Sequence, residues 1–284
     1  MANQKPVKVT SDGVKLHVEV FGDGVPLLFA HSLGACHHQV RGVLESLADD
    51  FRLITFDQRG HCQSMPVTDP ALYEPQRMAA DIGAILDHLG IEQAIVGGES
   101  MGAATALLFA ILHPKRVQQL ILVAPTAGDV ANPGRDMIVS LADFTAQYGL
   151  QAAADAVALA SMTQGIPRQA AAMVTSFWLH HRLESFVAAN RAVPDWVLFP
   201  DLTPVATLKM PIGVLAWGGD PSRPLPLARR LAGAARRGRM ESVESLAELA
   251  NEPATYARLI RKLLTLERKA GDGRREAEPV RRKA

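Results

Sequence analysis

A serine between two glycines is the part of this sequence best suited to nucleophilic chemistry. The run Gly98-Glu99-Ser100-Met101-Gly102 follows the apolar segment 94–97 and precedes a helical pattern over 103–111. Small residues at a strand-to-helix junction permit a sharp turn that projects the serine hydroxyl from the sheet edge. The helix start adds a positive dipole and free amide donors. The sequence therefore predicts Ser100 as a nucleophile.

A second segment could stabilise the negative charge that such an attack creates. His31-Ser32-Leu33-Gly34 follows the apolar run 26–30, where a backbone N–H can point at a developing oxyanion. Together with the Met101 amide it forms a pair of donors. A third polar segment, Asp57-Gln58-Arg59-Gly60-His61-Cys62-Gln63-Ser64, follows the run 52–56.

Short apolar runs must supply the strands that position these segments. Seven runs are predicted as strands: 7–10, 15–21, 26–30, 52–56, 94–97, 120–123 and 212–216. Helical patterns of period 3.6 separate most of them, such as the stripe Met78, Ile82, Ile85, Leu86 and Leu89. The alternation predicts an α/β fold, a mostly parallel sheet with helices on both faces and right-handed crossovers.

The middle of the chain interrupts this alternation. Residues 127–207 contain Ala-rich helical patterns and no clear buried strand, which predicts an inserted helical cap over the carboxyl edge of the sheet. Its aromatic cluster either lines a pocket or packs on the main domain: Phe177, Trp178, Trp196 and Phe199. The core then comprises 1–126 and 208–268, and the polar segment 269–284 is predicted to be a solvated, disordered tail.

Composition limits the class of protein. The 284 residues carry a net charge of +1, with 48% hydrophobic and 21% charged residues, which argues against disorder and nucleic-acid binding. We find no apolar run of about 18 residues and no signal-peptide pattern, so no membrane association is expected. Two cysteines fit a reducing cytoplasm. The expected partner is a small-molecule substrate or ligand, and a homo-oligomer is left open.

The segments HSLG, DQRGHCQS and GESMG, in this order and at these spacings, resemble the α/β-hydrolase superfamily over residues 10–265. Within it the chain is most similar to capped esterases and lactone hydrolases of the 3-oxoadipate enol-lactonase type. The resemblance implies Ser100 as the nucleophile, the Leu33 and Met101 amides as the oxyanion hole, and Glu99 in hydrogen bonds beneath the nucleophile. It implies Asp220 as the acid, with Asp129 as the alternative.

The sequence departs from the family at the catalytic base. The family places its histidine between the last strand and the last helix, here residues 240–253, and Leu246 stands at about that position. All nine histidines lie at or before His181. A serine hydroxyl is a weak nucleophile without a neighbouring base, and loss of that base costs about six decades of kcat in a serine protease.

Other titratable residues are candidate substitutes or pocket residues. Glu244 and Glu248 lie in the right loop, although a carboxylate is a weak base for an alcohol. His180 and His181 lie in the predicted cap and are either recruited over Ser100 or ordinary surface residues.

Four further histidines lie in or shortly after the two polar segments. His31 and His61 are expected to position loops, and His37 and His38 are candidates to line the pocket. The spacing of His31, His37 and His38 matches no recognised zinc pattern, so we expect no metal and no cofactor.

Three functions are compatible with these residues. The main prediction is hydrolysis of a small carboxylic ester or lactone through Ser100, with an incomplete triad. The alternatives are an oxyanion-stabilising enzyme for elimination, decarboxylation or cyclisation, and a non-catalytic small-molecule-binding protein of the same fold.

Overall fold

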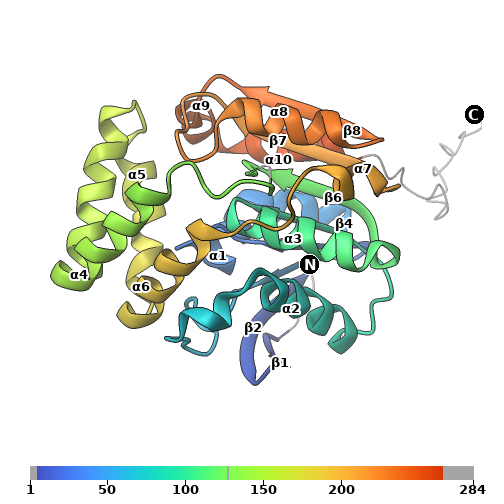
Figure 1. Cartoon of the computed structure of the whole chain (residues 1–284), viewed down its shortest axis with the longest axis horizontal. Helices are drawn as coiled ribbons and strands as arrows, with labels where there is room; N and C mark the ends of the chain where they lie inside the picture. The colour runs from blue at the N-terminus through green and yellow to red at the C-terminus, as the bar shows by residue number, and fades with distance from the viewer. Residues whose placement is uncertain (1–4, 127, 265–284) are drawn as a thin grey trace, which may run out of the picture.

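The computed structural model describes residues 5–126 and 128–264, and its strands form one sheet (Figure 1). The strands are β1 (Val7–Ser11), β2 (Val14–Phe21), β3 (Val25–Ala30), β4 (Phe51–Phe56), β5 (Ala94–Glu99), β6 (Val117–Val123), β7 (Ile212–Trp217) and β8 (Gly238–Val243). Their spatial order is β1-β2-β4-β3-β5-β6-β7-β8. β2 pairs antiparallel with β1 and β4, and every other pairing is parallel.

Helices connect the strands and cover both faces of the sheet. The α-helices are α1 (His37–Leu44), α2 (Pro75–His88), α3 (Met101–Leu112), α4 (Arg135–Thr163), α5 (Arg168–Ser176), α6 (Leu183–Ala192), α7 (Thr203–Thr207), α8 (Leu225–Ala234), α9 (Leu246–Asn251) and α10 (Pro253–Leu263). Short 3-10 helices are η1 (Glu45–Asp49), η2 (Pro70–Tyr73), η3 (Pro114–Arg116), η4 (Phe177–His180) and η5 (Val193–Asp195). Within the described residues, no helix combines the length and apolarity that crossing a membrane requires.

The sheet separates two hydrophobic cores. One contains buried side chains of α2, α3 and α8, and the other contains those of α1 and α10. This two-sided covering explains why the inner strands are continuous apolar runs, because both of their faces are buried. The predicted α/β architecture is confirmed.

All seven predicted strands are present, but β8 is missing from the prediction. Its sequence, Gly-Arg-Met-Glu-Ser-Val, is largely polar, and no residue of the strand is fully buried. Edge strands are often marked by charge rather than by an apolar run.

The segment 240–253, predicted as the loop between the last strand and the last helix, is not one loop. It contains the end of β8, all of α9 and the start of α10.

A helical insertion, α4 to α7, lies between β6 and β7 along the chain. Helices α4, α5 and α6 lie side by side at one end of the molecule (Figure 1). Helix α4 is interrupted at Gly149, whose backbone angles are not helical. Ala127, at the predicted start of the cap, and the predicted tail 269–284 lie outside the described residues.

A buried ion pair anchors the segment after β4. The Arg59 Nε and Nη2 atoms donate to the Asp81 carboxylate at 2.8 and 2.7 Å, and both side chains are essentially inaccessible to solvent. We expect Asp81→Asn to lower the free energy of unfolding by about 3–5 kcal/mol, because the Arg59 charge stays buried without its partner. Urea denaturation measures the loss. Asp87→Asn, which removes an exposed partner of Arg116, should cost less than about 1 kcal/mol.

Candidate active site

Ser100 occupies a strained turn between β5 and α3. Its φ of 53° is uncommon for a residue with a side chain. A Cβ on Gly98 would collide with the backbone of Gly102, and a Cβ on Gly102 would collide with the Ala30 carbonyl group. The two glycines are therefore needed for the close contact between β5, α3 and β3. The Ser100 amide donates to the Val123 carbonyl at 2.9 Å, which ties the turn to β6.

Ser100 borders a cavity of about 960 Å³. Most of the wall is apolar and comes from both the sheet edge and the helical insertion. Its apolar residues include Leu33, Met101, Ile138, Leu141, Val157, Trp178, Val193, Trp196 and Leu198. A cavity with this lining suits an apolar group attached to a polar reacting centre. Of the aromatic cluster in the insertion, Trp178 and Trp196 border the cavity, whereas Phe199 is buried in a core cluster.

Two backbone segments meet beside Ser100. Met101 is the first residue of α3, so its amide has no acceptor within the helix. Leu33 borders the cavity in the loop after β3, and the next amide, that of Gly34, is directed at His61 Nε2 at 3.5 Å. The Gly34 amide is thus directed at a side chain of the protein.

Asp220 lies on the same cavity but is engaged by an arginine. Its Oδ1 atom accepts from the Ser222 and Arg223 amides at 2.9 and 3.1 Å. Its Oδ2 atom accepts from the Arg223 side chain, with Nε at 2.8 Å and Nη2 at 2.6 Å. The guanidinium also stacks over Trp217, 5.6 Å from the ring centroid. Two N–H groups of the Arg223 guanidinium thus engage one oxygen of the Asp220 carboxylate, and two backbone amides engage the other.

The alternative acid lies elsewhere. Asp129 pairs with Arg230 of α8 and does not border the cavity that Ser100 lines.

Leu246 borders the cavity together with Ser100 and Asp220. It is the first residue of α9, and its side chain is 39% exposed. Ser245 caps this helix, and the Glu248 carboxylate accepts from the Glu244 amide at 3.0 Å. Neither glutamate lies on the cavity, and the Glu248 carboxylate binds the backbone at the start of α9 instead.

Glu99 connects the turn to the last helix. Its Oε2 atom accepts from the Tyr256 hydroxyl of α10 at 2.9 Å, and Glu99 also borders the cavity. Burial raises the pKa of the Glu99 carboxyl, while the nearby positive charge of Arg223 acts in the opposite direction. Burial raises the pKa of the Tyr256 hydroxyl as well, with the Glu99 charge adding to the effect.

His31 and His61 are fully engaged in loop hydrogen bonds. His31 Nε2 accepts from the Gln58 amide at 2.9 Å, so its Nδ1–H donates to the Ser32 carbonyl at 2.7 Å. His61 pairs through Nδ1 with the Arg59 carbonyl at 2.9 Å. Burial lowers the pKa of His31 to about 4 and that of His61 well below its usual value, so both rings are neutral.

The other candidate histidines also lie away from Ser100. His37 is buried against Asp57, and His38 and His180 are exposed. His181 turns into the protein, with Nδ1 3.1 Å from the Phe177 carbonyl and 3.6 Å from the Cys62 thiol. Of the nine histidines, all within the described residues, none borders the cavity that Ser100 lines.

Three residues of this site were not predicted from the sequence: Trp217, Arg223 and Tyr256. Arg223 follows Asp220 by three residues, and this spacing was the available signal for their pairing. The pairing of Tyr256 with Glu99 joins residues 157 positions apart, and no local pattern reveals it.

Comparisons with known proteins identify the fold family. Residues 25–200 match the family model described as the alpha/beta hydrolase fold. The chain is 29% identical over 220 residues to 3-oxoadipate enol-lactonase 2 of Acinetobacter baylyi, covering 75% of this chain and 79% of the relative. It is 30% identical over 114 residues to epoxide hydrolase 2 of Siraitia grosvenorii, covering 40% and 36%.

A solved structure matches almost the whole chain. The enol-lactonase from Burkholderia xenovorans LB400 superimposes with a TM-score of 0.78 at 23% identity, covering 92% of this chain and all of that one. At this identity the likeness shows the fold.

Proposed function

Because this chain belongs to the α/β-hydrolase fold family, we propose that it acts on a small carboxylic ester or lactone with Ser100 as the nucleophile. The observation that carries the proposal is the strained turn at Ser100, which borders a large apolar cavity beside the Met101 and Leu33 backbone. In the proposed reaction the Ser100 hydroxyl oxygen attacks the carbonyl carbon and loses its proton to solvent. The Leu33 and Met101 amides stabilise the resulting oxyanion. The ester C–O bond breaks, the alcohol oxygen is protonated, and water then hydrolyses the acyl-serine to the carboxylic acid; in a lactone the alcohol remains part of the acyl chain.

The substrate class follows from the cavity and from the relatives. The largely apolar wall supports a substrate with an apolar acyl or alcohol part. A lactone is an internal ester, so the similarity to an enol-lactonase is consistent with the same attack on a carbonyl. We assign the helical insertion as the cap that covers the substrate, since its residues supply a large part of the wall.

The proposed triad is incomplete. Leu246 stands where the family's histidine is expected, and no histidine borders the cavity within the described residues. The Arg223 guanidinium and two backbone amides satisfy the Asp220 carboxylate in place of an imidazole. Hydrolysis through Ser100 is therefore slow compared with that by an enzyme that has its base, because no side chain takes up the proton that the serine, and later the water, loses to solvent.

Two reagents test the role of Ser100. Purified protein is treated with a fluorophosphonate probe and, separately, with p-nitrophenyl butyrate. We expect slow labelling and slow hydrolysis in wild type and the loss of both in Ser100→Ala, because the nucleophile is removed. The matched control is Ser161→Ala, since Ser161 borders the same cavity from α4. Equal labelling and equal hydrolysis in wild type and Ser100→Ala would refute the proposal.

A further inference from the structure

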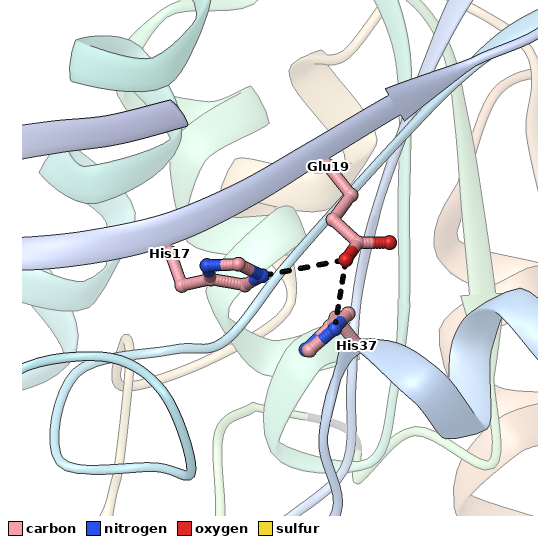
Figure 2. Close-up of side chains that lie close together, drawn as sticks. All are labelled: His17, Glu19 and His37. Carbon is pink, nitrogen blue, oxygen red and sulfur yellow. Dashed lines mark ion pairs between the residues drawn. The ribbon is translucent and has the colours of Figure 1, made fainter. Parts of the chain in front are cut away.

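A cluster of two histidines and one glutamate lies apart from the cavity, between β2 and the start of α1 (Figure 2). His17 and Glu19 are two positions apart on β2, so their side chains project from the same face of the strand. His37 is the first residue of α1, which packs on this face of the sheet. The fold thus brings together two residues of one strand and one residue of a helix.

The ligand atoms of the cluster converge. Glu19 Oε1 lies 3.5 Å from His17 Nε2 and 3.3 Å from His37 Nε2, as the dashed lines of Figure 2 mark. Ligand atoms of a tetrahedral zinc ion are about 3.3–3.4 Å apart, given Zn–N and Zn–O bonds of about 2.0–2.1 Å. The two nitrogen–oxygen distances therefore agree with the edges of such a tetrahedron.

The Nε2 atoms of His17 and His37 are buried, and each is paired with Glu19 without a hydrogen bond. The His37 side chain is inaccessible to solvent and that of His17 is 5% exposed. In the described part of the chain, neither Nε2 atom has a hydrogen-bond partner. Buried polar atoms are nearly always satisfied by a hydrogen bond or a ligand. Two such atoms aimed at one carboxylate oxygen indicate a position for a cation.

The surrounding contacts prepare the residues as ligands. His37 Nδ1 lies 2.8 Å from Asp57 Oδ1, and a ring N–H donated to a carboxylate leaves Nε2 free to bind a metal. The other oxygen of Glu19, Oε2, accepts from Arg41 Nη1 at 3.5 Å, so Oε1 remains available. The Glu19 side chain is 14% exposed and provides the route from solvent.

We propose that His17, Glu19 and His37 form a binding site for a divalent transition metal ion of the zinc type. Two imidazoles and one carboxylate are a donor set that zinc accepts, with water as the fourth ligand. The ion would connect β2 to the start of α1 and so brace the loop that leads from Leu33 to His37. The site is independent of the proposed reaction, since none of its three residues borders the Ser100 cavity.

Cobalt(II) is the probe that tests this site. Full-length protein freed of metal with EDTA is titrated with Co²⁺ and then with Zn²⁺. We expect one Co²⁺ per chain with the intense visible bands of tetrahedral cobalt, displaced by Zn²⁺. Glu19→Gln and His17→Gln should each weaken zinc binding by more than about 100-fold, the upper range for loss of an outer-shell partner.

The matched control is His88→Ala, which removes an exposed histidine from the end of α2 and should leave binding unchanged. For wild type, nitrogen NMR gives a readout that does not depend on the folding of a variant. The Nε2 resonances of His17 and His37 should shift on addition of one equivalent of Zn²⁺. The absence of saturable one-to-one binding, or unchanged Nε2 resonances, would overturn the proposal.

Discussion

Leu246→His is expected to raise the rate of p-nitrophenyl butyrate hydrolysis at least about tenfold. The side chain at position 246 borders the same cavity as Ser100 and Asp220, so an imidazole there can take the proton of the Ser100 hydroxyl. A well-placed general base contributes about 10²–10⁴-fold, and an introduced one recovers only part of this. The measurement is steady-state kcat/KM for wild type and variant.

Arg223 limits this gain, because it occupies the carboxylate that would orient the new imidazole. We therefore expect Leu246→His combined with Arg223→Met to exceed Leu246→His alone. Leu246→Asn is the matched control, since it is polar but has no base, and it should stay at the wild-type rate. Adding Ser100→Ala should abolish the gain. If folded Leu246→His shows no increase in kcat/KM, either alone or combined with Arg223→Met, position 246 is not the position of the missing base.

The free energy of unfolding is expected to fall by about 3 kcal/mol or more as the pH decreases from about 6.5 to 4. His31 has a folded pKa of about 4, whereas an unperturbed histidine titrates near 6.5. Between these values the unfolded chain binds a proton that the folded protein excludes, so stability is full above about pH 6.5 and is lost below it. The 2.5-unit difference corresponds to about 3 kcal/mol.

His61 adds to this loss, because burial also lowers its pKa. His37 has the opposite effect on the free energy of unfolding, since its contact with Asp57 raises its pKa. This contribution changes only above about pH 6.5, outside the range of the measurement.

Urea denaturation at a series of pH values measures the slope, and proton NMR of the His31 ring measures its pKa directly. His88→Ala should leave the slope unchanged, because this side chain is exposed. A flat free energy of unfolding between pH 6.5 and 4, or a His31 ring that titrates near 6.5, would contradict the expectation.

The sequence predicts the central strands well, because strands buried on both faces must be apolar over their whole length. Strands β3, β5 and β7 are examples. Strand β8 cannot be predicted in this way, because it is not apolar. It lies at the edge of the sheet and carries Arg239 and Glu241, so its pairing depends on β7 rather than on its own hydrophobicity.

The backbone of the candidate site follows from local sequence, whereas its side-chain partners do not. The turn at Ser100 requires small residues on both sides, and this requirement is visible in the motif. The partner of Asp220 depends on which positively charged side chain lies close enough to pair with it. In this structure that side chain is Arg223.

The His17–Glu19–His37 cluster could not be predicted from the sequence either, because its residues meet only through tertiary packing. Two residues at alternate positions of a strand and a third eighteen residues later form no recognised ligand spacing. Only the packing of α1 on β2 brings them together.

If Ser100 is a nucleophile without a base, its acyl-enzyme should be long-lived, and the lifetime of that adduct can be measured. Wild-type protein is mixed with p-nitrophenyl butyrate and followed by intact-protein and peptide mass spectrometry. An activated leaving group needs little help to depart, but hydrolysis of the acyl-serine needs a base to activate water. We expect one butyryl group on Ser100 that persists in wild type and is lost faster in Leu246→His. Rapid turnover without an adduct, or an adduct on another residue, would contradict it.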